Sequence, residues 1–321
     1  MKLLILTQKV DENDSVLGFF HRWVEEFAKQ YEEVIVVALG VGTYSLPSNV
    51  RVFSLGKEKG VSRIKYIFNF YKIILSERKN YDAVFVHMNP EYIVLGGVIW
   101  RIFNKKVALW YTHKSVTIKL RIASFLTQYI FTASAESFRL KSKKVHVMGH
   151  GIDTDFFTPN VQISRDKRVL SVGRLTKSKR HDLVIHAAAR AGRELYIIGE
   201  GPEYDSLRML VQSLNADVHF LGGITQTQVR DQYRKAGYLI HTSETGSLDK
   251  VVLEALACGL TVITTSTFLT GIPIEVVSAT PGAIAKAMLA AQHMNTTSVV
   301  SCVKEHHSLH RLIPKIVRLI S

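Results

Sequence analysis

Short apolar runs and longer amphipathic segments alternate along this chain. The runs have the length of buried strands, and the segments between them repeat their apolar residues at helical spacing. Strands that alternate with helices predict parallel, doubly wound sheets with helices on both faces. In the first half we expect strands at 2–8, 34–39, 51–55, 83–86, 107–111 and 145–148, and helices at 18–28, 62–78, 92–103 and 120–131.

The pattern stops near Thr158 and then restarts. Pro159 opens a polar stretch that continues to Lys167, and the next apolar run begins at Val169. At this length two domains are expected, and we predict them at residues 1–158 and 159–321. In the second domain we expect strands at 169–172, 195–198, 218–221, 238–241 and 260–265, and helices at 181–191, 203–214, 226–235, 251–257, 282–294 and 302–320.

One stretch of the second domain has the features of an anion-binding site. Residues 243–250 form a small and polar loop, a helical run containing Glu254 follows, and Gly259 suits the position that ends a helix. A loop at a helix N-terminus offers free backbone N–H groups and the positive end of the helix dipole to an anion. Glu254 could accept hydrogen bonds from hydroxyls. Together, an anion at the cap and hydroxyls one turn further on fit a nucleotide sugar.

Glycine-containing loops follow three other strands of this domain. They are Gly173-Arg174, with Lys179 further along, then Gly199-Glu200 and Gly222-Gly223. Ligands bind at the carboxyl edge of a parallel sheet, where such loops open. Arg174 offers a bidentate fork and Lys179 a point charge, and both suit a diphosphate. We interpret Lys177 and Arg180 in the same loop as a solvated basic turn.

These motifs, in this order, resemble those of the GT4 family (glycosyltransferase group 1) of retaining GT-B glycosyltransferases. The family signature has two glutamates separated by seven residues, followed by Ala, two further residues, Cys and Gly. Residues 254–259, Glu-Ala-Leu-Ala-Cys-Gly, match its second half, and Gly149-His150-Gly151 adds to the likeness. The first glutamate of the signature falls on Gly246, which is a departure. Glu244 or Asp249 could reach the same space.

The resemblance implies a GT-B fold, with two Rossmann-like domains facing a cleft. The donor is expected mainly on the second domain and the acceptor on the first, with helix 302–320 able to pack back on the first. The implied activity moves a sugar, with retention, from a nucleotide-diphosphate sugar to a hydroxyl of a lipid-linked sugar or glycan precursor of a cell-envelope polysaccharide. No metal or other cofactor is expected, and Asp153 and Asp155 are not expected to be metal ligands.

The resemblance also implies roles for individual residues. Arg174 and Lys179 would neutralise the leaving diphosphate, Glu254 would bind the ribose hydroxyls, and His113 would lie near the reaction centre. His87 resembles a second family position, for which we favour a structural role. The remaining donor-binding residues are expected to be Gly18, Gly173, Gly199, Glu200, Gly222, Gly223, Glu244, Gly246, Ser247, Leu248, Asp249 and Lys250.

The positive charge is concentrated on the predicted acceptor side. The formal net charge is +14, and residues 101–144 hold ten Lys and Arg against one Glu. This positive charge implies an acidic partner. Helix 62–78 mixes Lys and Arg with aromatic and aliphatic residues, which suits an anionic membrane surface. No apolar run reaches membrane-spanning length. With two cysteines, Cys258 and Cys302, we expect a cytoplasmic protein, peripheral on the inner face of the membrane.

Three other functions stay open from the residues alone. Gly246 in the signature allows a non-catalytic nucleotide-sugar-binding homologue, and a GT-B sugar epimerase would carry similar motifs. The charge also allows a basic nucleic-acid-binding protein, but no nucleic-acid-binding module is recognisable, and we expect no nucleic acid partner. A dehydrogenase is disfavoured because no Gly-x-Gly-x-x-Gly follows the first strand.

Overall fold

The chain forms two compact units, and each is built on a parallel sheet. The computed structural model describes residues 1–245, 248–269, 272, 274–290 and 296–321. The first unit comprises 1–151 with 309–321, and the second comprises 152–308. The division differs from the predicted 158/159 boundary because Ile152 and Phe157 are buried in the core of the second unit.

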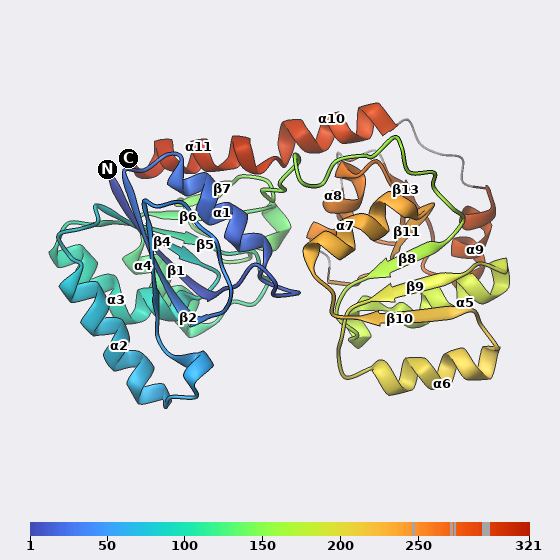
Figure 1. Cartoon of the computed structure of the whole chain (residues 1–321), viewed down its shortest axis with the longest axis horizontal. Helices are drawn as coiled ribbons and strands as arrows, with labels where there is room; N and C mark the ends of the chain where they lie inside the picture. The colour runs from blue at the N-terminus through green and yellow to red at the C-terminus, as the bar shows by residue number, and fades with distance from the viewer. Residues whose placement is uncertain (246–247, 270–271, 273, 291–295) are drawn as a thin grey trace. The chain divides into compact units, whose positions relative to one another are not determined.

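The seven strands of the first unit's sheet follow the order β3-β2-β1-β4-β5-β6-β7, all parallel (Figure 1). Side chains alternate across it, so that Leu3 and Ile5 face one core and Leu4 and Leu6 the other. The strands are β1 (Lys2–Val10), β2 (Glu33–Val41), β3 (Val50–Ser54), β4 (Ala83–His87), β5 (Lys106–Trp110), β6 (Tyr129–Thr132) and β7 (Val145–Val147).

Helices cover both faces of this sheet. On one face α1 (Phe19–Ala28) packs against α11 (Leu309–Ile320), the last helix in the chain. On the other lie α2 (Arg63–Ser76), α3 (Pro90–Ile102) and α4 (Ile118–Leu126). None of the helices in the described part of the chain has both the length and the apolar character needed to cross a bilayer.

Two helix predictions were wrong. The helix expected at 120–131 ends at Leu126, because Thr127 Oγ1 donates to the Val107 carbonyl and residues from Tyr129 onward join the sheet as β6. The helix expected at 302–320 is two helices, α10 (Thr296–His306) and α11. The break falls where Ser308 bridges to Ile152.

The second unit repeats the architecture with six parallel strands in the order β10-β9-β8-β11-β12-β13. Its strands are β8 (Val169–Val172), β9 (Leu195–Ile198), β10 (Val218–Gly222), β11 (Tyr238–His241), β12 (Thr261–Thr264) and β13 (Glu275–Val276). One face carries α5 (His181–Ala191), α6 (Tyr204–Leu214) and α9 (Pro281–Ala290), and the other carries α7 (Gln226–Lys235), α8 (Lys250–Ala257) and α10 (Figure 1).

The prediction of doubly wound parallel sheets is therefore confirmed for both units. In each sheet the strand order reverses at one point, between β1 and β4 in the first unit and between β8 and β11 in the second. The loops that leave the two strands at such a point run in opposite directions and open a crevice at the carboxyl edge, which is where ligands bind in open α/β sheets.

Candidate functional site

The loops after β8 and β11 meet at the switch point of the second unit. Lys179 lies at the centre, in a short 3-10 turn (Lys177–Lys179). Its Nζ is 2.5 Å from Asp249 Oδ2 and 3.2 Å from Ser243 Oγ. Thr242 Oγ1 is 2.9 Å from the carbonyl oxygens of both Lys179 and Arg180, which ties the two loops together. The predicted diphosphate-binding lysine is thus fixed beside the loop that leads into α8.

Asp249 joins Lys179 to a buried histidine that the sequence analysis did not single out. His241 Nε2 is 2.8 Å from Asp249 Oδ2, and His241 Nδ1 is 3.0 Å from Thr264 Oγ1. Burial alone would raise the pKa of Asp249, but the hydrogen bond from His241 and the charge of Lys179 outweigh it and hold that pKa well below its ordinary value. The signal for His241 is a polar residue at the end of an apolar strand, directly before the loop.

The other cations of the β8 loop differ in their surroundings. Arg174 is exposed, and it has no carboxylate partner among the residues that the structure describes. Arg180, interpreted from sequence as solvated, instead lies 3.2 Å from Asp182 and 2.5 Å from Glu244 in two ion pairs. Glu244 and Asp249 are therefore both paired with cations of this loop.

The glycine loops after β8, β9 and β10 form one hydrogen-bonded edge. Gly173 N donates to the Ile198 carbonyl and Gly199 N to the Gly222 carbonyl, both at 2.9 Å. Gly199 has a φ of +138°, and a Cβ there would lie 2.0 Å from the Gly173 carbonyl oxygen. Only glycine allows this approach. In addition, Glu200 Oε1 accepts from the backbone N–H of Gly223 at 3.2 Å, so its carboxylate bridges two of the loops.

Helix α8 begins directly after Asp249, the ion-pair partner of Lys179. Asp249 is its N-cap residue, but its carboxylate is turned to Lys179 and His241 and makes no cap hydrogen bond within the described residues. Leu248 is buried. Glu254 is only 5% exposed, and its carboxylate pairs with Lys250 Nζ at 2.9 Å. Gly246 and Ser247 lie outside the described residues.

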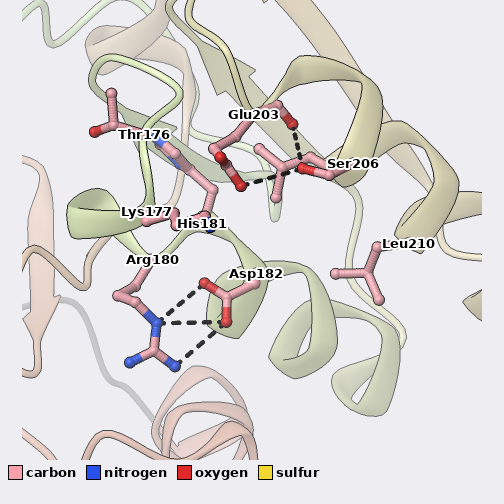
Figure 2. Close-up of a pocket in the computed structure, with 9 residues that line it drawn as sticks. Thr176, Lys177, Arg180, His181, Asp182, Glu203, Ser206 and Leu210 are labelled. Atoms are coloured by element: carbon pink, nitrogen blue, oxygen red, sulfur yellow. Dashed lines mark hydrogen bonds and ion pairs between the residues drawn. The ribbon is translucent and has the colours of Figure 1, made fainter.

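A pocket of about 360 Å³ lies beside the β8 loop (Figure 2). In Figure 2, the Arg180 guanidinium reaches Asp182 on one side of the pocket, and Ser206 donates to Glu203 at the start of α6. His181 lines this pocket and is itself buried, with Nδ1 2.8 Å from Ser171 Oγ. Burial lowers its pKa to about 4, so His181 is neutral at pH 7. A second pocket, of about 260 Å³, opens next to Ser243 and Glu244, and its other lining residues include Thr265, Ser266 and Phe268.

The remaining predicted residues lie in the first unit, apart from Asp153 and Asp155. His113 is exposed three positions after β5, and its Nδ1 accepts from Ser115 N at 3.1 Å. Gly18 precedes α1, and a Cβ there would lie 2.6 Å from the Asp14 carbonyl oxygen, so the backbone packing requires glycine. His87 is buried and stacks on Phe20, with ring centroids 4.1 Å apart. Asp153 Oδ1 accepts from the backbone N–H groups of Asp155 and Phe156, as a turn cap does.

One group of possible metal ligands in the second unit lies away from this edge. Glu194, Asp217 and His219 bring ligand atoms within 4.8 Å of one another at the amino ends of β9 and β10. The three side chains are largely exposed and already paired, with His219 Nε2 3.1 Å from Glu194 and 3.2 Å from Asp217. The geometry offers no link between this group and the switch point.

Comparison with known proteins assigns the unit that holds this site. Residues 153–295 match the family model described as glycosyl transferases group 1. The second unit is therefore similar to group 1 glycosyl transferases over the residues that form the switch point. The resemblance deduced from the sequence motifs is thereby confirmed.

Curated relatives match over part of their length. The chain is 30% identical over 135 residues to N-acetylgalactosamine-N,N'-diacetylbacillosaminyl-diphospho-undecaprenol 4-alpha-N-acetylgalactosaminyltransferase of Campylobacter jejuni. The matched residues make up 40% of this chain and 37% of the relative. It is 28% identical over 158 residues to D-inositol 3-phosphate glycosyltransferase of Mycolicibacterium smegmatis, 44% of this chain and 36% of the relative. The matches thus span little more than a third of each relative.

Solved structures extend the likeness to the whole fold. Anabaena HepE in complex with UDP superposes with a TM-score of 0.76 at 15% identity, covering 100% of this chain and 99% of that one. WaaG, a glycosyltransferase involved in lipopolysaccharide biosynthesis, gives a TM-score of 0.71 at 15% identity and 99% coverage of both chains. The two parallel-sheet units are therefore those of a GT-B fold, as predicted.

Proposed function

We propose that this protein is a retaining glycosyltransferase that moves a sugar from a nucleotide-diphosphate sugar to a hydroxyl of a lipid-linked acceptor. One observation carries the proposal: Lys179 lies at the sheet switch point, between two loops, and its partner is a carboxylate that a diphosphate can replace. Support comes from relatives named for undecaprenol-diphosphate and inositol-phosphate acceptors, and from a neighbour solved with UDP-glucose.

The donor would lie along the carboxyl edge of the second unit's sheet. Its diphosphate would contact Lys179, the exposed Arg174 and the backbone N–H groups at the start of α8, while Glu254 would accept hydrogen bonds from the ribose hydroxyls. These cations and N–H groups stabilise the charge that develops on the leaving diphosphate. In a retaining reaction the leaving phosphate takes the acceptor's proton on the face that it vacates. His113, in the first unit, keeps the proposed catalytic role that the family resemblance implies.

Truncation of the two cations tests the donor site. Arg174→Ala and Lys179→Ala should each lower turnover by roughly 10²-fold, the scale for losing one preorganised electrostatic contact. Lys177→Ala is the matched control, because Lys177 is an exposed cation of the same loop with no place in the proposed site. Release of nucleoside diphosphate from UDP-, GDP- and ADP-sugars measures turnover.

The outcome separates the proposal from its rivals. Wild-type turnover in both truncated variants would show that the donor lies elsewhere. Donor binding without release of nucleoside diphosphate would identify a non-catalytic binding protein. An isomerised sugar formed without acceptor would identify an epimerase.

We also propose that the protein binds the anionic inner face of a membrane through its first unit. On α2 the side chains of Ile64 and Phe68 are 81% and 61% exposed, and Lys65 Nζ lies 5.3 Å from the centre of the Phe68 ring. Apolar side chains next to cations suit the boundary between headgroups and acyl chains. Each Lys or Arg near an anionic surface contributes about 1 kcal/mol, screened by salt.

Sedimentation with vesicles tests this placement. Binding should rise with the fraction of anionic lipid and fall with added salt. Binding that ignores both lipid charge and salt, or no binding at all, would favour a soluble acceptor.

A further inference from the structure

The first unit has an apolar pocket at its own switch point. It encloses about 500 Å³ between α2 and α3, within the range of small-molecule sites. Its walls are mainly apolar, and Tyr71 OH donates to the Leu95 carbonyl at 3.1 Å, which holds the two helices together at the pocket. The apolar wall residues are Leu39, Leu55, Tyr66, Ile67, Phe70, Tyr92 and Leu95.

Polar groups gather where the sheet's strand order reverses. Gln8, on β1, donates through Nε2 to Asn89 Oδ1 at 3.3 Å, and Asn89 follows β4. Between β4 and Asn89 stands Met88, whose φ of +65° is strained for a residue with a side chain. Strain of this kind is tolerated where the surrounding structure fixes a functional loop. The pocket therefore has a polar floor at the edge where open α/β sheets bind ligands.

The pocket also has a cationic rim. Arg63 and Lys119 both line it, from α2 and α4. Lys119 Nζ lies 3.0 Å from Glu91 Oε1, and Arg63 has no carboxylate partner within the described residues. The rim therefore carries a net positive charge, which complements an anionic group held beside an apolar cavity.

The helices that carry this pocket also expose apolar side chains along their length. Large hydrophobic side chains on all three helices of this face are exposed, although a solvated helix face normally carries polar residues. They alternate with cations, and Arg101 lies over the Phe125 ring at 5.9 Å. The exposed set is Ile64, Ile67, Phe68 and Leu75 on α2, Val98 and Ile102 on α3, and Ile118, Ile122 and Phe125 on α4.

We propose that this pocket holds the first segment of the hydrocarbon chain of a phosphate-bearing lipid, with the phosphate at Arg63 and Lys119. The apolar walls match a hydrocarbon chain and are poor partners for sugar hydroxyls, while the rim matches the phosphate. The exposed apolar surface lets such a chain pass from a bilayer into the pocket without crossing water. That the bound lipid is the sugar acceptor rests on the proposed function. Binding of the chain itself does not.

Calorimetry with decyl phosphate below its micelle concentration tests the pocket. The protein should bind decyl phosphate far more tightly than inorganic phosphate, because the chain supplies most of the affinity. Ile67→Asp places a charge in the pocket wall at a position that is 43% exposed, so the fold should survive. It should weaken decyl phosphate binding roughly 10- to 30-fold, the scale for losing one buried aliphatic side chain.

Leu75→Asp is the matched control. Leu75 lies on the same helix, twelve residues beyond Arg63, is 39% exposed and does not line the pocket, so this variant should bind decyl phosphate like the wild type. Arg63→Ala should weaken binding of decyl phosphate several-fold and leave binding of uncharged decyl maltoside unchanged. Equal losses in Leu75→Asp and Ile67→Asp would show adsorption on the surface and overturn the pocket assignment, as would inorganic phosphate binding as tightly as decyl phosphate.

A variant of the proposed donor site distinguishes the pocket proposal from the proposed function. Lys179→Ala should lower sugar transfer roughly 10²-fold and retain decyl phosphate binding. A protein that binds decyl phosphate in the pocket but transfers no sugar would refute the proposed function alone. A protein that transfers sugar yet gives no calorimetric signal with decyl phosphate would refute the pocket proposal alone.

Discussion

Asp249→Asn tests how strongly one carboxylate stabilises the proposed donor site. The carboxylate contacts Lys179 and His241, and the side chains of Asp249 and Lys179 are only 14% and 18% exposed. Removing one partner of a buried pair costs about 3–5 kcal/mol, because the other charge stays buried without a counter-ion. Since Lys179 retains some contact with water, we expect the lower end, about 3 kcal/mol.

Calorimetric unfolding at pH 7 measures this loss. The pKa of Asp249 is lowered in the folded state, so its contribution is fully present above the ordinary value of 3.8 and is lost only as the pH falls through the folded-state pKa. For a unit of this size, about 3 kcal/mol corresponds to a melting temperature lower by about 6–12 °C. A loss below about 2 °C would refute the reasoning.

The same variant should respond more strongly to nucleotide. If Lys179 binds the diphosphate as proposed, the ligand must displace Asp249 from Lys179 in the wild type, whereas in Asp249→Asn it supplies the missing anion. A saturating nucleoside diphosphate should therefore raise the melting temperature of the variant more than that of the wild type. The double variant Lys179→Met/Asp249→Asn is the control, since it removes both charges. It should recover part of the lost stability and lose the extra nucleotide response.

Three further predictions concern single groups. Glu254→Gln should weaken binding of whichever of UDP or GDP the protein accepts, by calorimetry, because a carboxylate that accepts from two hydroxyls becomes a weaker acceptor; unchanged affinity would exclude the ribose role. The folded-state pKa of His181, about 4, lies below the ordinary value of 6.5. The free energy of unfolding should therefore fall by about 3 kcal/mol as the pH drops from 6.5 to 4. His181→Gln should flatten that pH dependence, as measured by urea titrations. Turnover should survive EDTA, and strict dependence on a divalent metal would contradict charge neutralisation by Arg174 and Lys179.

The strands were predictable because buried parallel strands are near-continuous apolar runs. Residues 3–6 and 83–86 illustrate this, since both faces of the sheet are covered and every position is buried. The helix prediction for residues 127–131 was wrong because Tyr129, Ile130 and Phe131 are equally compatible with a buried strand and a buried helix. What decides is a tertiary contact, the bond from Thr127 to the neighbouring strand, which local periodicity does not encode.

The sequence predicted where the residues of the candidate site lie better than it predicted which residues they pair with. The location of Lys179 and Gly199 follows from loops that leave the carboxyl ends of parallel strands. The pairing of Arg180 with Glu244, and of His241 with Asp249, joins residues from different elements, and their choice depends on side-chain geometry in the folded unit. A polar residue at the end of a buried strand is a feature that could have indicated His241, although the sequence analysis did not single it out.

The position of α11 has a consequence for how the protein is made. Residues 309–320 complete the core against α1, where Leu312 packs near Trp23, yet the ribosome synthesises them only after the whole second unit. Until then the first unit keeps an apolar face uncovered in the cell. The second unit is therefore expected to fold before the core of the first unit is complete. The incomplete first unit is expected to depend on chaperones until residues 309–320 have been synthesised.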